Sequence, residues 1–491
     1  MATERDSEPT SGQPDTSAAS GFTPTLSTRH LPGVEVRDLP AAPTNTWRII
    51  GPGLVGAGVG LASGEFILWP YISSQVGLVF LWGAVIGVTT QWFLNMEIER
   101  YTLATGETAL TGFSRLWKHW GLVFALMTYF ANMWPGWATS SATLVSYIFG
   151  GNVTVIAIAI LLICGATLTL APVVYAALER VIFVKVAVIV VFIVVAIVFA
   201  ITADAWTELG RAVTHVGQFP SSELGWALML GAIAYAGAGG GQNLCQSNWI
   251  RDKRFGMGSY VPRLVSPVTG EEEAAPSTGF VFAPTERNLA RWRDWWRFAN
   301  IEQAATFVLV TAFTIGFMSM LAFSTVYGRA NLPDDIAFLQ IEGQVLQERV
   351  GSWFGYFFWV IGAYALFAAA MGIIDYTSRL AADLIATVYR RGSGMSESRI
   401  YFILVWGLVV FGCVVLLLGV DQPLVLLVIS SSVSGVMMAI YGALLIYMNK
   451  RALPRALRVR KFRTTVIALA VAFYGTLGII TVIQQGQRLF E

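Results

Sequence analysis

The chain has 491 residues, of which 55% are hydrophobic and only 13% are charged, and its formal net charge is +2. Soluble domains carry about twice that share of charged residues, so the composition excludes an ordinary soluble protein and indicates a polytopic membrane protein. The basic residues lie in separate loops rather than in one patch, so we expect no nucleic-acid partner. Three cysteines and three histidines, far apart in the sequence, offer neither a disulfide framework nor a metal cluster.

Residues 1–46 are rich in Ser, Thr, Pro and Asp and contain no apolar run. We therefore expect a disordered cytoplasmic tail rather than a signal peptide, followed by a transmembrane domain over residues 47–491. Eleven segments of that domain are long and apolar enough to cross a lipid bilayer. Their approximate ranges are 48–76, 79–100, 119–149, 153–171, 180–202, 223–249, 298–326, 352–388, 399–420, 423–448 and 464–486.

The loops between these segments alternate in their content of basic residues. Five of them contain most of the arginines and lysines, including eight in the long loop 251–297, and Lys185 is counted with the loop before the fifth span. These five share one side of the membrane with the amino terminus, whereas the opposite loops contain only Arg211, Arg329 and Arg349. The positive-inside rule predicts a multi-pass plasma-membrane protein with a cytoplasmic amino terminus and an extracytoplasmic carboxyl terminus.

The long cytoplasmic loop 251–297 has an acidic, proline-containing middle that we expect to be unstructured. Its end differs, because the stretch 291–297 mixes arginines with three tryptophans. That pattern predicts a helix in the lipid headgroup layer, where an anchoring role is favoured over a regulatory one.

Two spans contain glycine clusters that a continuous helix would tolerate poorly. In the first span, residues 51–65 include six glycines and end on a carboxylate, Glu65. In the sixth span, residues 230–243 include five glycines and end on two amides, Gln242 and Asn243. Glycine weakens a helix interior and an ionised acid in hydrocarbon is costly, so both segments indicate unwound helices that line a solute or ion site. Close helix packing at small residues is the alternative explanation.

The two interrupted spans are five spans apart, which matches an inverted repeat of five plus five helices. Repeat one covers about 47–202, repeat two about 223–448, and an extra helix about 464–486. This arrangement brings freed carbonyls, freed amides and half-helix dipoles together near the membrane midplane. The sequence therefore predicts an all-α membrane protein with a binding site between the two breaks. Its candidate residues are Ala62, Gly64, Glu65, Gly237, Gly240, Gln242 and Asn243.

Five short motifs, spread over most of the chain from about residue 47, carry a resemblance to a known family. They are Gly51-Pro52-Gly53-Leu54, Ala104-Thr105-Gly106, Ser141-Ala142 through Ile148-Phe149-Gly150, Tyr175 with Leu178-Glu179-Arg180, and Asn243-Leu244. They resemble parts of the Nramp divalent-metal transporters, which have the eleven-helix LeuT-type fold. The resemblance implies a secondary active transporter of that fold, with helices one and six unwound.

The site residues depart from the family pattern. Ala62 stands where the family has a metal-binding Asp, and Glu65 stands where it has a coordinating Asn. Residues 240–243 replace Met-Pro-His-Asn of the family's helix six, so the soft thioether ligand is gone. Gly237 falls where the family lends a backbone carbonyl to the metal. If a metal is bound, Glu65 and the Gly237 carbonyl are its expected ligands.

Other residues inside spans are candidates for coupling. Asp375 and Arg379 lie one helical turn apart in span eight, which favours an internal ion pair. In LeuT-type folds helix eight faces helix one, so Asp375 with Thr377 or Ser378 could instead form a sodium site.

Span three contains two large rings beside a proline. The resemblance aligns Trp134 and Trp137 with the acids of the family's proton route, so we do not expect proton coupling by that route. The two rings serve either as packing or as a wall of the cavity.

Three functional hypotheses remain open. One carboxylate, two amides and exposed backbone oxygens form a hard ligand set, which suits Mg²⁺ or Mn²⁺ transport with H⁺ or Na⁺ as a coupling ion. The same groups suit a small organic solute such as an amino acid or amine, with sodium coupling. A non-transporting membrane sensor is the third hypothesis. We expect no resident cofactor and no catalytic activity, since no nucleophile-base pair or phosphate loop is found, and the oligomeric state stays open.

Overall fold

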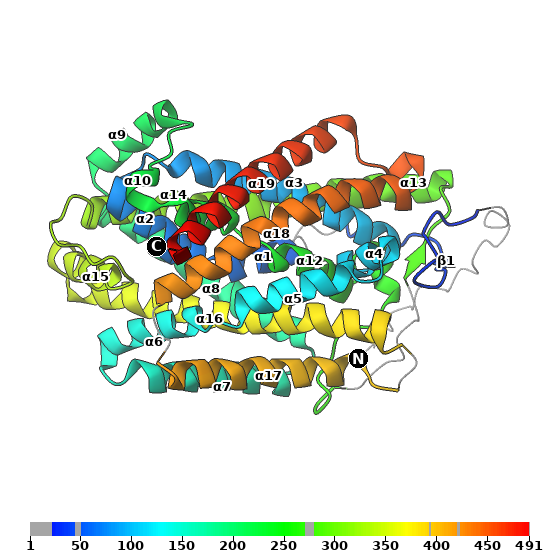
Figure 1. The fold of residues 1–491 in the computed structure, drawn as a ribbon, viewed down its shortest axis with the longest axis horizontal. Coiled ribbons are helices and arrows are strands. Elements are labelled where there is room, and N and C mark those ends of the chain that lie inside the picture. The colour runs from blue at the N-terminus through cyan, green and yellow to red at the C-terminus, as the bar shows by residue number, and fades with distance from the viewer. Residues whose placement is uncertain (1–21, 45–50, 271–278, 392–393, 420–422, 491) are drawn as a thin grey trace, which may run out of the picture.

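A computed structural model of the chain describes residues 22–44, 51–270, 279–391, 394–419 and 423–490. Most of them are helical, and most helices run along the long axis of the molecule (Figure 1). Eight helical segments in the described part are long and apolar enough, by length and composition, to cross a membrane. The prediction of an all-α polytopic membrane protein is confirmed, whereas the count of eleven spans stays a prediction.

The first repeat contains the helices that end before residue 200. They are α1 (Pro52–Gly60), η2 (Ser63–Leu68), α2 (Trp69–Val76), α3 (Leu81–Thr105), α4 (Ala109–Leu116), α5 (Trp120–Asn132), α6 (Gly136–Phe149), α7 (Val153–Leu170) and α8 (Val174–Phe199). Several helix ends follow from the local sequence. Thr108 and Asn152 accept hydrogen bonds as N-caps of α4 and α7, and Gly106 ends α3 at φ 64°, where a left-handed residue is needed.

The remaining elements form the second repeat, its connections and the last helix. They are α9 (Ala203–Ala212), η3 (Val213–His215), α10 (Ser221–Leu224), α11 (Trp226–Ala234), α12 (Gly241–Asp252), η4 (Gly256–Tyr260), α13 (Glu286–Glu302), η5 (Gln303–Val308), α14 (Leu309–Thr325), α15 (Phe338–Arg349), α16 (Ser352–Leu384), η6 (Ile385–Tyr389), α17 (Glu397–Leu417), α18 (Pro423–Ala452), η7 (Arg455–Leu457) and α19 (Lys461–Phe490). Two short strands, β1 (Glu35–Val36) and β2 (Phe280–Val281), pair in parallel.

Two predicted spans are each divided into two shorter helices. The span 119–149 consists of α5 and α6, which are separated at Pro135, a residue that cannot continue a helical hydrogen-bond ladder. The span 223–249 consists of α11 and α12, which are separated by residues 235–240. Each half is too short to cross a bilayer by itself, so these helices must act in pairs.

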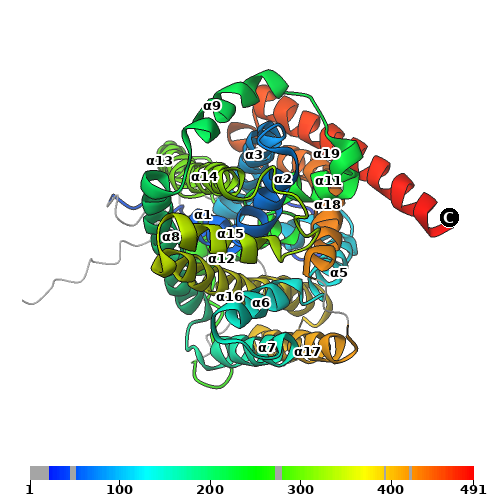
Figure 2. The same ribbon diagram turned by 90° about the vertical axis from the view of Figure 1, so that its left-hand side faces the viewer.

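The two ends of the bundle differ in the elements they carry. In Figure 1, α9, α10 and α15 lie at the left-hand end, and α4 and β1 lie at the right-hand end. Figure 2, which looks along the bundle, places α1 and α12 inside the ring of other helices, and every residue of both helices is buried. The two interrupted helices therefore occupy the interior, which is where a transport site would have to lie.

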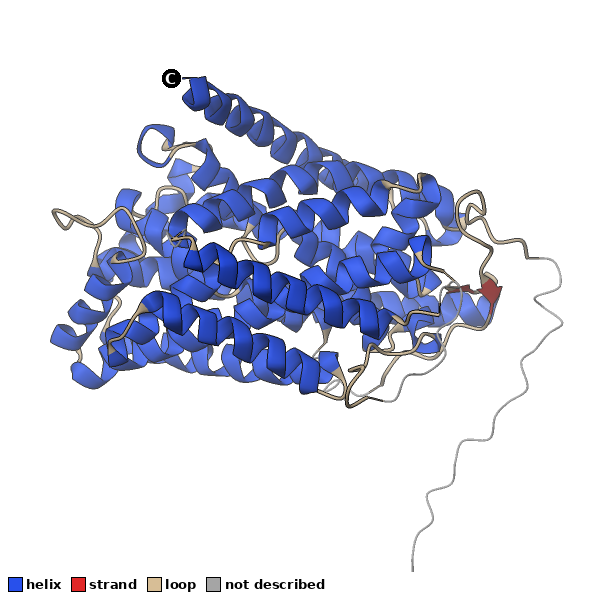
Figure 3. Cartoon of the chain, turned by 60° about the horizontal axis from the view of Figure 1, so that its bottom comes forward, coloured by secondary structure: helices blue, strands red, loops and turns tan. Residues whose placement is uncertain are grey.

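The prediction of a disordered tail is wrong for residues 22–44. β1 pairs with β2 at one end of the molecule (Figure 3), and the backbone of Leu39 is bound on both sides by side chains of α13. Asn288 accepts from Leu39 N at 3.1 Å, and Arg291 donates to Leu39 O at 2.6 Å. A polar composition did not reveal these partners because they lie some 250 residues away. Residues 1–21 and 45–50 lie outside the described residues.

The prediction that residues 291–297 form a helix in the lipid headgroup layer also needs correction. The tryptophan-rich stretch 291–297 belongs to α13, which continues through η5 into α14 as one 40-residue helical segment. Trp292 and Trp295 are buried, and Trp295 donates to Pro40 O at 2.8 Å. The aromatic rings are thus held by the amino-terminal segment rather than by lipid. Residues 271–278, in the middle of the predicted loop, lie outside the described residues.

Candidate binding site at the two helix breaks

The first interrupted helix loses its α-helical geometry directly after Gly60. Leu61 has φ −66° and ψ 63°, and Ala62 has φ −160° and ψ −75°, so neither residue is helical. A short wide helix, η2, then begins at Ser63 and carries Glu65. The break frees carbonyl oxygens at the end of α1, which is the negative end of that half-helix dipole.

The second interrupted helix opens over a longer stretch. Residues 235–240 separate α11 from α12. Three of the glycines in this stretch have positive φ angles, 112° at Gly237, 92° at Gly239 and 55° at Gly240. Residues other than glycine are disfavoured in such conformations, so the glycine cluster is what permits the break.

The two breaks lie directly against each other. A Cβ atom built on Gly60 would lie 1.5 Å from the carbonyl oxygen of Gly237, and one built on Gly64 would lie 2.1 Å from that of Tyr235. Only backbones without side chains can approach so closely. The structure therefore holds the candidate residues Ala62, Gly64, Glu65 and Gly237 together, and the Gly237 carbonyl, an expected metal ligand, is covered by Gly60.

Glu65 is the carboxylate at this junction. Its side chain has 0% exposure, and neither of its oxygens has a hydrogen-bond partner among the described residues. An unsatisfied buried carboxylate is costly, so the group requires a proton, a cation or a ligand donor. Within the described part of the chain, no cluster of three or more His, Cys, Asp or Glu side chains is placed to hold a metal ion. A metal at Glu65 would therefore depend on backbone and amide oxygens.

A buried lysine lies beside this carboxylate. Lys185 of α8 has 0% exposure, and its ammonium group donates to the carbonyl oxygen of Gly58, in the last turn of α1, at 2.7 Å. Lys185 and Glu65 also act on each other electrostatically. The sequence placed Lys185 at the start of the fifth span, whereas α8 begins at Val174, so the lysine lies well inside the helix. The missed signal was the apolar sequence on both sides of it.

The amides of the second break are bound to neighbouring helices. Gln242 donates to Gly56 O of α1, and Asn243 donates to Asn95 of α3, while the oxygen of Asn243 has no partner within the described residues. Gly240 packs against α18, since a Cβ there would lie 2.7 Å from atoms of Ser434. Gln242 and Asn243 thus join the broken helices, whereas Gly240 faces a supporting helix.

Gln91 of α3 holds the second break open, a role that the sequence did not reveal. Its amide nitrogen donates to the carbonyl oxygens of Ile233 and Ala234, at 3.3 and 2.9 Å. Its oxygen accepts from the backbone nitrogens of Ala238 and Gly239, at 2.9 and 3.1 Å. One side chain thereby satisfies backbone groups that the missing helical turn leaves free.

The second group of predicted residues lies in α16. Arg379 donates to both oxygens of Asp375, at 2.8 and 3.1 Å, and Tyr401 donates to Asp375 at 2.8 Å. Thr377 accepts from Asn132 at 3.0 Å, and Ser378 has no partner among the residues described. Both oxygens of Asp375 are therefore occupied by donors in this structure.

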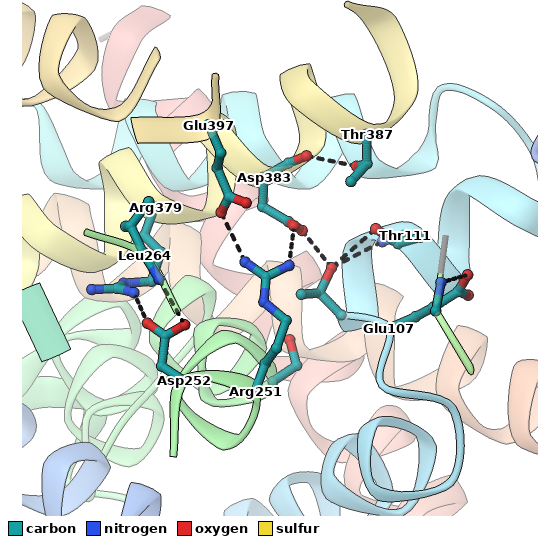
Figure 4. A network of polar contacts seen from close by, with 12 residues as sticks. Glu107, Thr111, Arg251, Asp252, Leu264, Arg379, Asp383, Thr387 and Glu397 are labelled. Atoms are coloured by element: carbon teal, nitrogen blue, oxygen red, sulfur yellow. Dashed lines mark hydrogen bonds and ion pairs between the residues drawn. The ribbon is translucent and has the colours of Figure 1, made fainter. Parts of the chain in front are cut away.

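Arg379 belongs to a larger polar network that Figure 4 displays. Arg379 also pairs with Asp252 at the end of α12, whose neighbour Arg251 binds Asp383 of α16 at 2.6 Å and Glu397 of α17 at 2.8 Å. All of these groups lie near the end of the bundle that carries α4. The network joins α12, α16 and α17, so it fixes the second half of the broken helix to its neighbours.

The two tryptophans of span three take different positions. Trp137 is buried, with 3% exposure, whereas Trp134 is partly buried and lies edge-on to Phe130, with ring centroids 6.1 Å apart. The indole nitrogens of both rings have no hydrogen-bond partner within the described residues. Contacts of Trp134 with the half-exposed Phe130 place that ring toward the outer side of α5.

No protein-family model and no curated protein matches the chain. Solved structures do match it. A mutant form of the Eremococcus coleocola manganese transporter gives a TM-score of 0.66 at 12% identity, covering 95% of this chain and 92% of that chain. The complex of that transporter with an aromatic bis-isothiourea substituted compound gives 0.63 at 13% identity, covering 94% and 91%. A nucleobase-cation-symport-1 family transporter, closed around bromovinylhydantoin, gives 0.50 at 13% identity, covering 90% and 91%.

At these identities the likeness concerns the fold alone. Nearly the whole chain superposes on nearly the whole of each of these transporters. The two breaks lie at the first and sixth spans, as an inverted repeat of this architecture requires. The chain therefore has the LeuT-type transporter fold with helices one and six interrupted, and its membership of the Nramp family stays a prediction.

Proposed function

We propose that the chain is a secondary active transporter that carries a small, positively charged solute between the two helix breaks. A hard divalent cation such as Mg²⁺ or Mn²⁺ is the first candidate, with Glu65 as its carboxylate ligand and carbonyl oxygens at the end of α1 beside it. The LeuT-type fold supports this proposal, because folds with inverted repeats place their substrates at paired interrupted helices.

One observation carries the proposal: the side-chain nitrogen of a lysine already binds at the break in the first helix. The Lys185 ammonium binds the Gly58 carbonyl at 2.7 Å and acts electrostatically on Glu65. Carbonyls at the C-terminal end of a helix carry partial negative charge, and an ionised Glu65 adds a full one. The end of α1 together with Glu65 therefore attracts positive charge, which is what a cationic cargo needs.

A divalent cation would have to compete with the lysine. Two positive charges held close together in a buried site repel each other strongly. Release of the ammonium from Gly58, by movement or by loss of a proton, would leave that carbonyl free for the cargo. We therefore expect cargo binding and the state of Lys185 to be thermodynamically linked.

The lysine also supports a second candidate, an organic amine or zwitterion such as an amino acid. The group now bound at the break is the terminal nitrogen of a lysine, so the Gly58 carbonyl is placed to accept a hydrogen bond from an amine. In this alternative Glu65 binds the amine of the cargo, and Lys185 binds its carboxylate.

Uptake into proteoliposomes distinguishes the two candidates. Accumulation of Mn²⁺ or Mg²⁺ supports the first, and stabilisation and uptake of amino acids or amines supports the second. The substitution Lys185→Met separates the two candidates further, because its expected effects on their binding affinities are opposite. It should strengthen binding of a divalent cation by removing a competing charge, and it should weaken binding of a zwitterion by removing a partner. Binding without uptake of either class would favour the membrane-sensor hypothesis instead.

Glu65→Gln should abolish uptake while leaving the protein folded. The substitution preserves the size of the side chain, and no hydrogen bond to a described residue is lost. Because a charged hydrogen bond contributes about 1.5–3 kcal/mol, affinity for a cationic cargo should fall at least about tenfold. Glu348→Gln, at an exposed position of α15, is the matched control and should transport normally. Unchanged uptake in Glu65→Gln would remove Glu65 from the site.

A further inference from the structure

We infer that Glu99 and Glu302 form a second cation-binding site, which holds one proton and links proton binding to the position of α1. Glu99 lies in α3 and Glu302 ends α13, near the end of the bundle that carries α4. Both side chains have 0% exposure. The coupling role of this site rests on the proposed transport function, whereas proton binding by the pair does not.

The two carboxylates have few donors. Glu302 Oε1 accepts from Gly53 N at 2.8 Å and lies 3.2 Å from the hydroxyl of Thr306. Glu99 Oε2 lies 3.5 Å from the amide nitrogen of Gln246, at the limit of a hydrogen bond. The other oxygen of each carboxylate has no partner among the residues that the structure describes. Each acid of the pair therefore keeps one unpartnered oxygen.

Nearby positive charges do not neutralise the pair, because each is already bound to another acid. The helices that carry the two acids pack together, since α3 contacts both α13 and η5, and Glu99 and Glu302 act on each other electrostatically across this contact. Among the described residues, the charged and titratable groups on the adjoining elements include Arg100 and Arg463 paired with Glu97, Lys253 paired with Glu179, Arg251 paired with Asp383, and Tyr175. Two adjacent buried carboxylates without a counterion cannot both be ionised, so one proton must be shared between them.

The donors indicate which acid carries that proton. Glu302 is favoured as the carboxylate, since the Gly53 N–H and the field of Lys253 stabilise its charge. Glu99, whose only donor among the described residues is the long contact with the Gln246 amide, is then the carboxylic acid. Binding of the proton converts two carboxylates into one carboxylate and one acid, and no other bond changes. The acid gains the ability to donate a hydrogen bond, which an ionised carboxylate lacks.

A row of polar side chains on α3 connects the acid pair with the break in the sixth helix. Gln91, Asn95 and Glu99 are spaced four residues apart in α3, so they share one face of that helix. Gln91 binds the break itself, Asn95 accepts from Asn243, and Glu99 accepts from Gln246. Polar side chains thus run continuously from the candidate substrate site to the acid pair.

Glu302 also contacts the first half-helix, so its surroundings depend on where α1 lies. Gly53 lies in the first turn of α1, and a Cβ there would lie 2.8 Å from Glu302 Oε2, so α1 and Glu302 are in close contact. If α1 moves away, Glu302 loses its backbone donor, which by itself favours protonation, but the pair also becomes accessible to water, which favours the ionised form. Because burial has the larger effect on Glu302, proton binding is strongest when α1 is docked, and reciprocal linkage makes the proton favour docking.

Transport measurements test the coupling role. The cargo identified in the uptake assay is added outside the proteoliposomes. An inward proton gradient should then accelerate its uptake by the wild-type protein. Glu99→Gln imitates the protonated acid permanently, so its uptake should no longer respond to the gradient, while cargo exchange across the membrane persists. The matched control is Glu342→Gln, because Glu342 is equally buried and has one unpartnered oxygen among the described residues, but lies in α15 at the opposite end. Gradient-driven uptake in Glu99→Gln would overturn the proposal.

Infrared spectroscopy of the purified protein tests proton binding without any cargo. The difference between wild type and Glu99→Gln at neutral pH should contain one carboxylic-acid band, which Glu302→Gln alters and added Na⁺ or Mn²⁺ leaves unchanged. Absence of that band would overturn the proposal, as would its loss on adding either metal ion, which would identify a metal site. If no cargo is transported by the wild type, the proposed function fails, but the infrared result still decides whether the pair holds a proton.

Discussion

Glu65 and Lys185 are buried charges of a different kind from the ion pairs around them. Arg379 and Asp375 satisfy each other at 2.8 and 3.1 Å, which is the arrangement that makes buried charges tolerable in a stable helix bundle. Glu65 has no hydrogen-bond partner among the described residues, and Lys185 binds a carbonyl rather than the acid. Groups left incompletely satisfied in a bundle interior are candidates for binding, because a ligand can complete them.

Gly60→Ala tests the contact between the two breaks. The new Cβ would lie 1.5 Å from the Gly237 carbonyl oxygen, and a backbone cannot give way as a flexible side chain can. Transport should be lost and the free energy of unfolding should fall by about 1–3 kcal/mol, as for other overpacked sites. Thermal denaturation in detergent and cargo uptake measure the two effects.

Gly407→Ala is the control for that substitution. In the described part of the chain, no atom lies within 4 Å of a Cβ built at this position of α17, apart from its own helix backbone and chain neighbours. Because alanine is the better helix former by about 1 kcal/mol, this variant should be as stable as the wild type or more so. A Gly60→Ala variant that behaves like Gly407→Ala would show that the breaks do not touch.

At the scale of elements, α15 covers one end of the interrupted first helix. Phe338 of α15 lies against Tyr71 of α2, with ring centroids 5.8 Å apart, and Trp359 of α16 donates to Leu339 O at 3.0 Å. Glu342 is fully buried in this helix, and the Thr325 hydroxyl lies 3.5 Å from one of its carboxylate oxygens. Burial raises the pKa of Glu342 from 4.5 to about 8, although the Thr325 contact lowers it somewhat.

This shift predicts how stability depends on pH. The folded protein binds the Glu342 proton more tightly than the unfolded chain does, so stability falls as pH rises from about 4.5 to about 8. The slope attributable to this group is about 1.4 kcal/mol per pH unit. Glu342→Gln should remove that part of the slope and raise the melting temperature at pH values near 8. If the melting temperatures of variant and wild type differ by the same amount at every pH, Glu342 is not the source of this pH dependence.

At the scale of the whole molecule, the distribution of charged loops gives the bundle a direction. The ends carry different elements, with α9 and α15 at one end and α4 and β1 at the other (Figure 1). The positive-inside rule predicts that the end with α4 and β1 faces the cytoplasm. Alternating access then requires the two breaks to open toward each end in turn.

Cysteine labelling tests this orientation. Val213 and Val268 are well exposed, at 75% and 63%, and they lie in segments predicted on opposite sides of the membrane. In a background without the three native cysteines, Val213→Cys should react with a membrane-impermeant maleimide on intact cells. Val268→Cys should react only after permeabilisation. The reverse pattern would invert the predicted topology.

The sequence determined the class of fold and the positions of both helix breaks, because these depend on local composition. A glycine-rich run within an apolar segment disfavours a continuous helix wherever that segment lies, so residues 51–65 and 230–243 could be recognised without a structure. The same local patterns indicated Glu65, Gln242 and Asn243 as neighbours of the breaks.

Only the tertiary structure decided the partners of these residues. Lys185 binds Gly58 across 127 residues of sequence, and Gln91 binds Ala234 across 143. The amino-terminal segment is ordered by α13, from which some 250 residues separate it. No periodicity or composition encodes which distant groups meet, since burial and hydrogen bonding between them arise only when the helices pack.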